Sequence, residues 1–172
     1  GHSLGGLYAQ ACARRRPELV TGLVLVDPVV RGQEALLRRH DRLGAALLSA
    51  RQNTLPGAAG RELRASVGLQ AELAALPVYE RGPVLTLVAG RDRPSESLAF
   101  KNARRTAMRE QTLQYPQGEL IEIEDGGAML HEEQPRAIAD AVLRILQRGG
   151  PATPASQAED RSMRLPVVWR TR

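Results

Sequence analysis

The first six residues of the chain place a serine between glycines in the pattern G-x-S-x-G. A serine hydroxyl attacks a carbonyl carbon effectively when a tight turn holds it clear of the backbone and a neighbouring base takes its proton. Such a turn strains the backbone at Ser3 and brings the preceding strand close to the following helix. We expect glycine at positions 1 and 5 because a side chain there would fill the space between strand and helix. The pattern therefore predicts a nucleophilic Ser3 at a strand-to-helix turn.

Ser3 needs a base, and the chain contains three histidines. His131 lies in a predicted loop between a strand and a helix that Pro135 introduces, at the edge of a sheet where ligand sites lie. His2 neighbours Ser3, so its side chain should point away from the serine and have a structural role beneath the turn. His40 lies on an arginine-rich helical face that we expect in solvent. His131 is therefore the candidate base.

The motif resembles the nucleophile elbow of the α/β-hydrolase family. In that family the nucleophile, acid and base follow one another along the chain, which is the order of Ser3, Asp92 and His131. The resemblance covers residues 1 to about 148. It implies the C-terminal portion of an α/β fold, with a parallel sheet flanked by helices and with a helical cap insertion.

The acid follows from the same resemblance. Asp92 comes directly after an apolar strand, as the family's usual acid does. Asp27 is the alternative acid, because it follows the preceding strand and some relatives place the acid there; an Asp-Pro pair that simply ends a strand is the structural interpretation. Glu124 and Asp125 also remain open, although residues so near His131 in sequence reach its far nitrogen with difficulty.

The resemblance implies acyl transfer to water in the manner of a serine esterase. Ser3 would attack a carbonyl, His131 would carry the proton, and water would release the acyl group. The backbone N–H of Leu4, the residue after the nucleophile, would be one oxyanion donor. In the family the second donor comes from a loop before the elbow, which is not in this chain. We therefore expect a chain truncated at the N-terminus and inactive when isolated.

Hydrophobic patterning predicts the elements that must position these side chains. Unbroken apolar runs predict strands covered on both faces, and spacings of three and four predict amphipathic helices. Ser95 is a possible N-cap of one of these helices. We expect strands at 22–27, 83–90 and 119–123, and helices at 4–15, 33–51, 61–76, 95–114 and 137–147.

The domain organisation follows from where strands are predicted. Residues 1–30 and 77–148 form a partial α/β-hydrolase core, and residues 31–76 form a helical cap, with ordinary sheet-covering helices as the alternative. Residues 149–172 have the composition of a linker and no hydrophobic period, which predicts a disordered C-terminal tail.

Composition argues against several other functions. The net charge of +5 comes from arginines scattered among nearly as many acidic residues, and with one Trp, three Tyr and one Phe the chain lacks the aromatic platforms of nucleic-acid binding. We expect neither a metal nor a cofactor, because HExxH, a cysteine cluster and a P-loop lysine are missing. No apolar run is long enough to span a membrane, and we expect a cytoplasmic protein.

The sequence leaves the substrate open. We expect a small molecule with an acyl or ester group, while lactones, amides and carbon–carbon bonds remain alternatives. A rival hypothesis of another class is a catalytically inactive remnant or binding module that keeps the motif without the full fold.

Overall fold

The sheet at the centre of the protein is parallel, as the sequence predicts. A computed structural model describes residues 1–93 and 96–148. Neighbouring strands pair in the same direction, so their carboxyl ends meet at one edge of the sheet. All residues of the middle strand are buried, which explains its unbroken apolar sequence. The strands lie in chain order: β1 (Leu23–Val26), β2 (Val84–Ala89) and β3 (Gly118–Ile123).

The first residues of the chain extend this sheet beyond β1. His2 forms a parallel bridge with Val26. The carbonyl of Gly1 accepts the N–H of Val26 at 2.9 Å, and the N–H of Ser3 donates to the carbonyl of Val26 at 3.0 Å. Ser3 therefore stands at the same edge of the sheet as the carboxyl end of β1.

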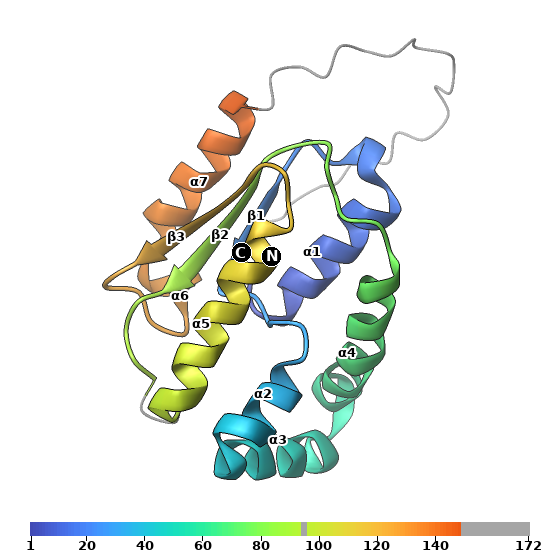
Figure 1. The fold of residues 1–172 in the computed structure, drawn as a ribbon, viewed down its shortest axis with the longest axis vertical. Coiled ribbons are helices and arrows are strands. Elements are labelled where there is room, and N and C mark those ends of the chain that lie inside the picture. Colours follow the sequence, from blue (N-terminus) through green and yellow to red (C-terminus); the bar gives the residue numbers. More distant parts are fainter. Residues whose placement is uncertain (94–95, 149–172) are drawn as a thin grey trace, which may run out of the picture.

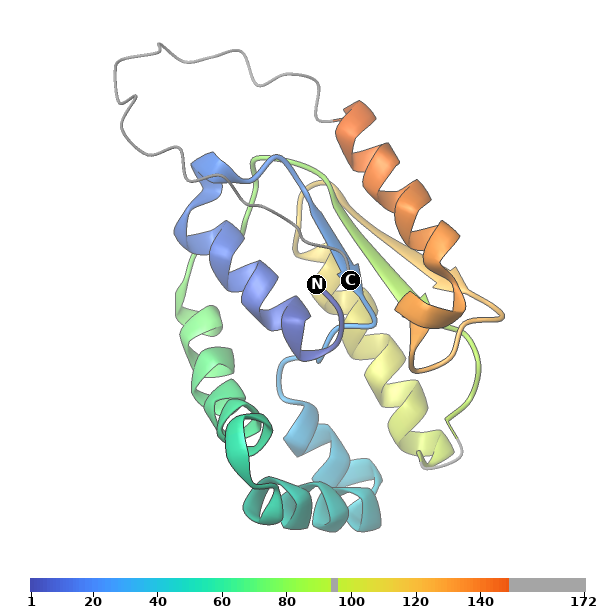
Figure 2. The same ribbon diagram turned by 180° about the vertical axis from the view of Figure 1, so that it is seen from behind.

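Helices cover both faces of the sheet (Figures 1 and 2). Helix α7 (Pro135–Arg148) packs on one face, whereas α1 (Leu4–Arg15) and α5 (Leu98–Leu113) pack on the other. Side chains of successive strand residues point to opposite faces, so alternate residues supply two separate cores. The core beneath α7 contains Val26, Leu85, Leu87, Leu130, Ala141 and Ile145. The opposite core contains Ala13, Leu23, Leu25 and Val84 beside α1, and Val88 and Met108 beside α5.

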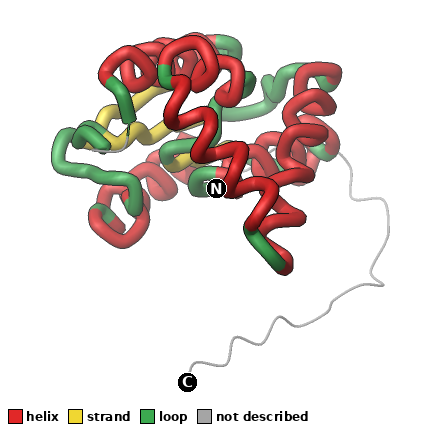
Figure 3. Tube along the Cα trace, turned by 90° about the horizontal axis from the view of Figure 1, so that it is seen from below, coloured by secondary structure: helices red, strands yellow, loops and turns green. Residues whose placement is uncertain are grey.

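Three helices connect β1 to β2 and form one end of the molecule (Figure 1): α2 (Gln33–His40), α3 (Arg42–Thr54) and α4 (Gly57–Ala75). Helix α4 packs along α1, and the buried guanidinium of Arg14 donates to the carbonyl of Leu73 at 2.8 Å. Arg14 thus satisfies a carbonyl in the last turn of α4 that the helix itself leaves unpaired. Viewed from below, the strands lie between helices (Figure 3).

Several boundaries differ from those the sequence predicts. The helix expected over 33–51 is two helices, because the side chain of Asp41 accepts the N–H of Gly44 and caps a second helix there. Helix α4 begins at Gly57, before the expected start at residue 61. Helix α5 has Ser97 as its N-cap, whose hydroxyl accepts the N–H of Phe100. Ser95 and the expected tail over 149–172 lie outside the described residues.

No helix among residues 1–93 and 96–148 is long and apolar enough to cross a membrane.

Candidate active site

Ser3 adopts the strained backbone that its sequence context predicts. Its φ is +50° and its ψ is −121°, a backbone region that residues other than glycine rarely occupy. The carbonyl of Ser3 accepts two backbone N–H groups, from Gly6 at 3.0 Å and from Val29 at 3.2 Å. The turn is therefore held from both α1 and the segment that follows β1.

The glycines around Ser3 have different roles from those we expected. A Cβ on Gly1 would lie 2.4 Å from the carbonyl oxygen of Gly5, so strand and helix do approach closely there. A Cβ added to Gly5 would have no atom within 4 Å, so the expectation that a side chain at position 5 would fill the space between strand and helix was wrong. Gly6 is crowded as well, because a Cβ added there would lie 2.8 Å from the Cβ of Pro28.

Leu4 is the first residue of α1, directly after Ser3. A backbone N–H in the first turn of a helix has no intrahelical acceptor, and the helix dipole favours negative charge at this end. The N–H of Leu4 can therefore donate to an oxyanion that forms at Ser3. The side chain of Leu4 packs with Val29 and with Leu69 of α4 against a buried cluster around Leu7.

His131 lies beside the elbow although it is 128 positions further along the chain than Ser3. It belongs to the one-turn helix α6 (Leu130–Glu133), not to a loop as expected. Its ring centroid lies 4.4 Å from that of His2, with the two ring planes inclined at 44°. The His131 side chain is 41% exposed, and its Nε2 lies 3.6 Å from a carboxylate oxygen of Glu132. A solvent-accessible imidazole next to the nucleophile turn is suited to proton transfer.

His2 is the residue that sequence reasoning missed at this site. We expected it beneath the turn, but its Nε2 lies 3.1 Å from the carbonyl oxygen of Ala128, in the connection between β3 and α6. His2 therefore contacts both His131 and the backbone that precedes it. From the sequence, strand alternation predicts only that the side chains of His2 and Ser3 point in opposite directions. It does not predict which distant segment the side chain of His2 contacts.

Asp92 lies beyond the carboxyl end of β2, and its side chain is 69% exposed. It forms an ion pair with Lys101 of α5. Within the described part of the chain, no hydrogen bond joins Ser3, Asp92 and His131 to one another, so the structure brings His131 to the elbow without closing a triad. Glu124 and Asp125 are exposed in the turn after β3.

Asp27 follows β1 and has a φ of +42°. Its carboxylate is 2% exposed and is occupied at both oxygens, because Arg104 binds Oδ1 at 3.1 Å and Arg93 binds Oδ2. Glu96 contacts both arginines, at 3.1 Å from Arg93 and 3.5 Å from Arg104. These four residues, which we call the buried charge network, join the end of β1 to α5 at the edge of the sheet where the site lies.

The loop that carries Asp92 is bound to α6, which carries His131, and to the connection that precedes α6. The N–H of Arg91 donates to the carbonyl of Gly126 at 3.0 Å, and the Arg91 guanidinium forms an ion pair with Glu133 of α6. The same carboxylate accepts the N–H of Gly127 at 3.0 Å. The candidate acid therefore lies on a loop, and the candidate base on a short helix, with a shared set of contacts.

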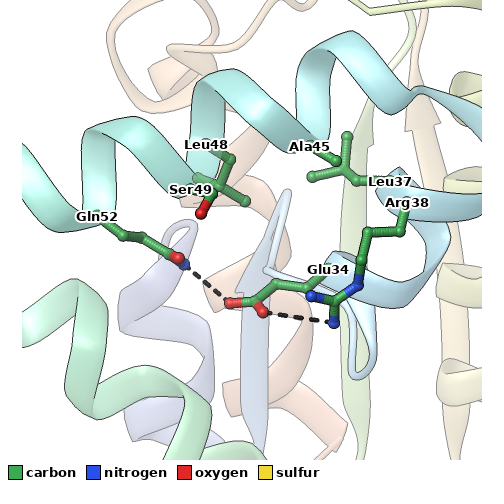
Figure 4. Close-up of a pocket in the computed structure, with 7 residues that line it drawn as sticks. All are labelled: Glu34, Leu37, Arg38, Ala45, Leu48, Ser49 and Gln52. Carbon is green, nitrogen blue, oxygen red and sulfur yellow. Dashed lines mark hydrogen bonds and ion pairs between the residues drawn. The ribbon is translucent and has the colours of Figure 1, made fainter.

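Two cavities among helices α2, α3 and α4 are not lined by Ser3. A cavity of about 40 Å³ between α2 and α3 is lined by Glu34 and Gln52, whose side chains bond at 2.8 Å (Figure 4). An open groove of about 490 Å³ separates α2 from α4. Among residues 1–93 and 96–148, no group of three or more His, Cys, Asp or Glu side chains is arranged to hold a metal ion.

Comparison with known proteins identifies the family. The family model described as the alpha/beta hydrolase family matches residues 1–141 of the chain. The chain belongs to the alpha/beta hydrolase family. No curated protein sequence matches it.

Solved structures show the same fold. A probable hydrolytic enzyme from Pseudomonas aeruginosa matches with a TM-score of 0.50 and 22% identity, over 86% of this chain and 62% of that one. A proposed non-heme bromoperoxidase from Mycobacterium tuberculosis matches with a TM-score of 0.55 and 19% identity, over 87% of this chain and 66% of that one. The chain thus spans less than two thirds of the length of these structures and forms part of an α/β-hydrolase fold.

Proposed function

We propose that the protein is a serine hydrolase that transfers an acyl group from a small-molecule ester to water. One observation carries the proposal: Ser3 is held at φ +50° at the start of α1, and the ring of His131 lies against the residue that precedes it. A strained serine at a helix N-terminus with an imidazole nearby is an arrangement for nucleophilic catalysis.

In this mechanism the Ser3 hydroxyl oxygen attacks the carbonyl carbon, and His131 accepts the hydroxyl proton. The negative charge that forms on the carbonyl oxygen is stabilised by the N–H of Leu4. His131 then gives its proton to the departing alcohol. Water attacks the acyl-serine while His131 takes a proton from it, and that proton returns to Ser3 as the acid product leaves.

Asp92 is our proposed acid, which orients His131 and stabilises its cation. Two observations favour it over Asp27. Both carboxylate oxygens of Asp27 are occupied by arginines and buried, whereas Asp92 is exposed and has a single partner, Lys101. Through Arg91, the loop of Asp92 is also bonded to α6, which carries His131, and to the connection before it. Hydrogen bonds between catalytic groups are often long before substrate binds and shorten in the complex.

Helices α2, α3 and α4 are proposed as the cap over this site. Leu69 of α4 packs with Leu4 and Val29 next to the proposed oxyanion donor, so the cap provides an apolar wall where the acyl group would lie. Such a wall favours a modest apolar acyl group over a charged one.

A fluorophosphonate probe, which reacts with activated serines, tests the proposal in the full-length protein. We expect the probe to label the protein at Ser3, and Ser3→Ala to abolish both labelling and ester hydrolysis. Asp92→Asn should lower kcat by as much as ~10⁴-fold, as loss of the acid does in other triads. A larger loss in Asp27→Asn than in Asp92→Asn, both being folded, would assign the acid to Asp27. Absence of labelling in the folded protein would support the inactive remnant or binding module instead.

A further inference from the structure

We propose that His2 is a positioning residue that sets the distance between the nucleophile and the base. The inference rests on the proposed function and concerns a residue to which neither the motif nor the triad assigns a task. It follows from two contacts of one side chain: the ring of His2 lies 4.4 Å from the ring of His131, and its Nε2 lies 3.1 Å from the carbonyl oxygen of Ala128.

The contact with Ala128 fixes where His2 carries a proton. A backbone carbonyl can only accept a hydrogen bond, so Nε2 of His2 must be the donor. A neutral His2 in this bond has its lone pair on Nδ1. The hydrogen bond therefore selects one tautomer of His2 and fixes the orientation of its ring. The ring of His131 packs against a ring whose position is thereby fixed.

The backbone of His2 is as firmly placed as its ring. His2 bridges to Val26 in the sheet, and the residues on either side of it, Gly1 and Ser3, both bond to Val26. Because Ser3 is the next residue, one short segment of chain fixes the nucleophile through its backbone and the base through its side chain. His2 thus links the sheet directly to the connection that precedes α6 and to His131 on that helix.

His131 needs such support. It sits on a helix of a single turn, α6, and its side chain is 41% exposed. A helix this short has little stability of its own, so its position depends on neighbouring contacts. A misplacement of about 1 Å between reacting groups can cost on the order of 10²-fold in rate.

The test separates the two contacts of His2 in the full-length protein. His2→Phe keeps a ring against His131 but loses the N–H donor to Ala128, whereas His2→Gln keeps an N–H donor of similar reach but loses the ring. His2→Ala loses both. We expect kcat for a small ester to fall about 10²-fold in His2→Ala with KM changed less than about twofold, because ground-state binding is unaffected. The Phe and Gln variants should each recover part of that loss.

His40→Ala is the matched control, because it removes an imidazole from α2 in the cap segment, and its kcat should equal that of the wild type. Wild-type kcat in His2→Phe and His2→Gln alike would overturn the proposal, even if His2→Ala were unstable. A loss confined to KM would also overturn it, since the effect would then be on substrate binding. The proposed function fails separately, if Ser3→Ala retains turnover.

Discussion

Two residues at the carboxyl edge of the sheet have a positive φ, Ser3 at +50° and Asp27 at +42°. The G-x-S-x-G pattern predicts the first, because the serine must leave the backbone surface at a tight turn. Nothing near Asp27 in the sequence predicts the second. The carboxylate of Asp27 is held in the buried charge network by two arginines that lie more than 60 positions further along the chain.

The buried charge network should be important for stability. Arg104 is 4% exposed, and it binds an aspartate carboxylate that is itself inaccessible to water. Replacing it by a residue of similar length, in Arg104→Met, leaves the carboxylate of Asp27 with Arg93 alone. We expect a loss of roughly 3 kcal/mol in the free energy of unfolding, because a buried charge that loses a partner is poorly compensated.

Urea unfolding of the full-length protein measures this change. Arg109→Met is the matched control, since Arg109 is exposed on the same helix, and it should shift stability by no more than about 0.5 kcal/mol. Equal midpoints for the two variants would show that the network contributes little to folding.

At the scale of elements, Asp41 joins α2 and α3 to the N-terminus of α5. One carboxylate oxygen accepts the N–H of Gly44 at 2.8 Å, and the other accepts the N–H of Ser97 at 3.0 Å. The hydroxyl of Ser97 returns a bond to the carbonyl of His40 at 3.0 Å. The bonds from the N–H of Ser97 and of Gly44 hold the pKa of Asp41 below its usual range.

A depressed pKa makes this junction sensitive to acid. The folded state binds the proton of Asp41 less readily than the unfolded state, so the stabilisation is fully present above the unfolded pKa and is lost as pH falls through the lower, folded pKa. Asp41→Asn should therefore be less stable than the wild type at neutral pH, and the difference should shrink in strong acid.

Unfolding free energies of the two proteins over an acid-to-neutral pH series check this prediction. Asp140→Asn removes a negative charge from an exposed position on α7 and controls for net charge. A difference between wild type and Asp41→Asn that stays constant with pH would contradict the linkage.

The sequence predicts elements better than it predicts their junctions. Apolar runs and helical periodicity locate all three strands and the helices α1 and α7 closely, because each must bury one side or both. The apolar period continues on both sides of Asp41, so periodicity alone predicts one helix there. The break depends on a single side-chain bond from Asp41, which caps the second helix and leaves no trace in the period. The one-turn helix α6 is too short to produce a period.

The same contrast applies to the candidate site: the sequence predicts its residues better than it predicts the contacts between them. Candidate residues can be chosen from type, order and strand ends, so Ser3 and His131 could be proposed from sequence alone. Their surroundings depend on long-range contacts that a pattern does not contain, such as the ring of His2 against His131 and the pairing of Asp92 with Lys101.

For the whole molecule, we propose that residues 1–172 produced alone do not turn over an ester. The chain spans 62% and 66% of the two structures compared above. In α/β-hydrolases the second oxyanion donor comes from a loop before the elbow. Loss of one such donor typically lowers the rate by about 10²–10³-fold. Ester hydrolysis at the buffer rate is the expected result, with full-length protein as the positive control. Turnover above buffer, with slow amide exchange across β1, would show that these residues suffice.

The contacts between the loop of Asp92 and the segment that carries His131 have a consequence for protein engineering. Arg91, next to the proposed acid, bonds to Gly126 and pairs with Glu133, so each of the two segments supports the other. Segments 90–93 and 126–133 should therefore be transferred together when a chimaera is made from two relatives. A chimaera that receives one segment from a relative keeps half of this interface, whereas one that receives both segments keeps the interface whole.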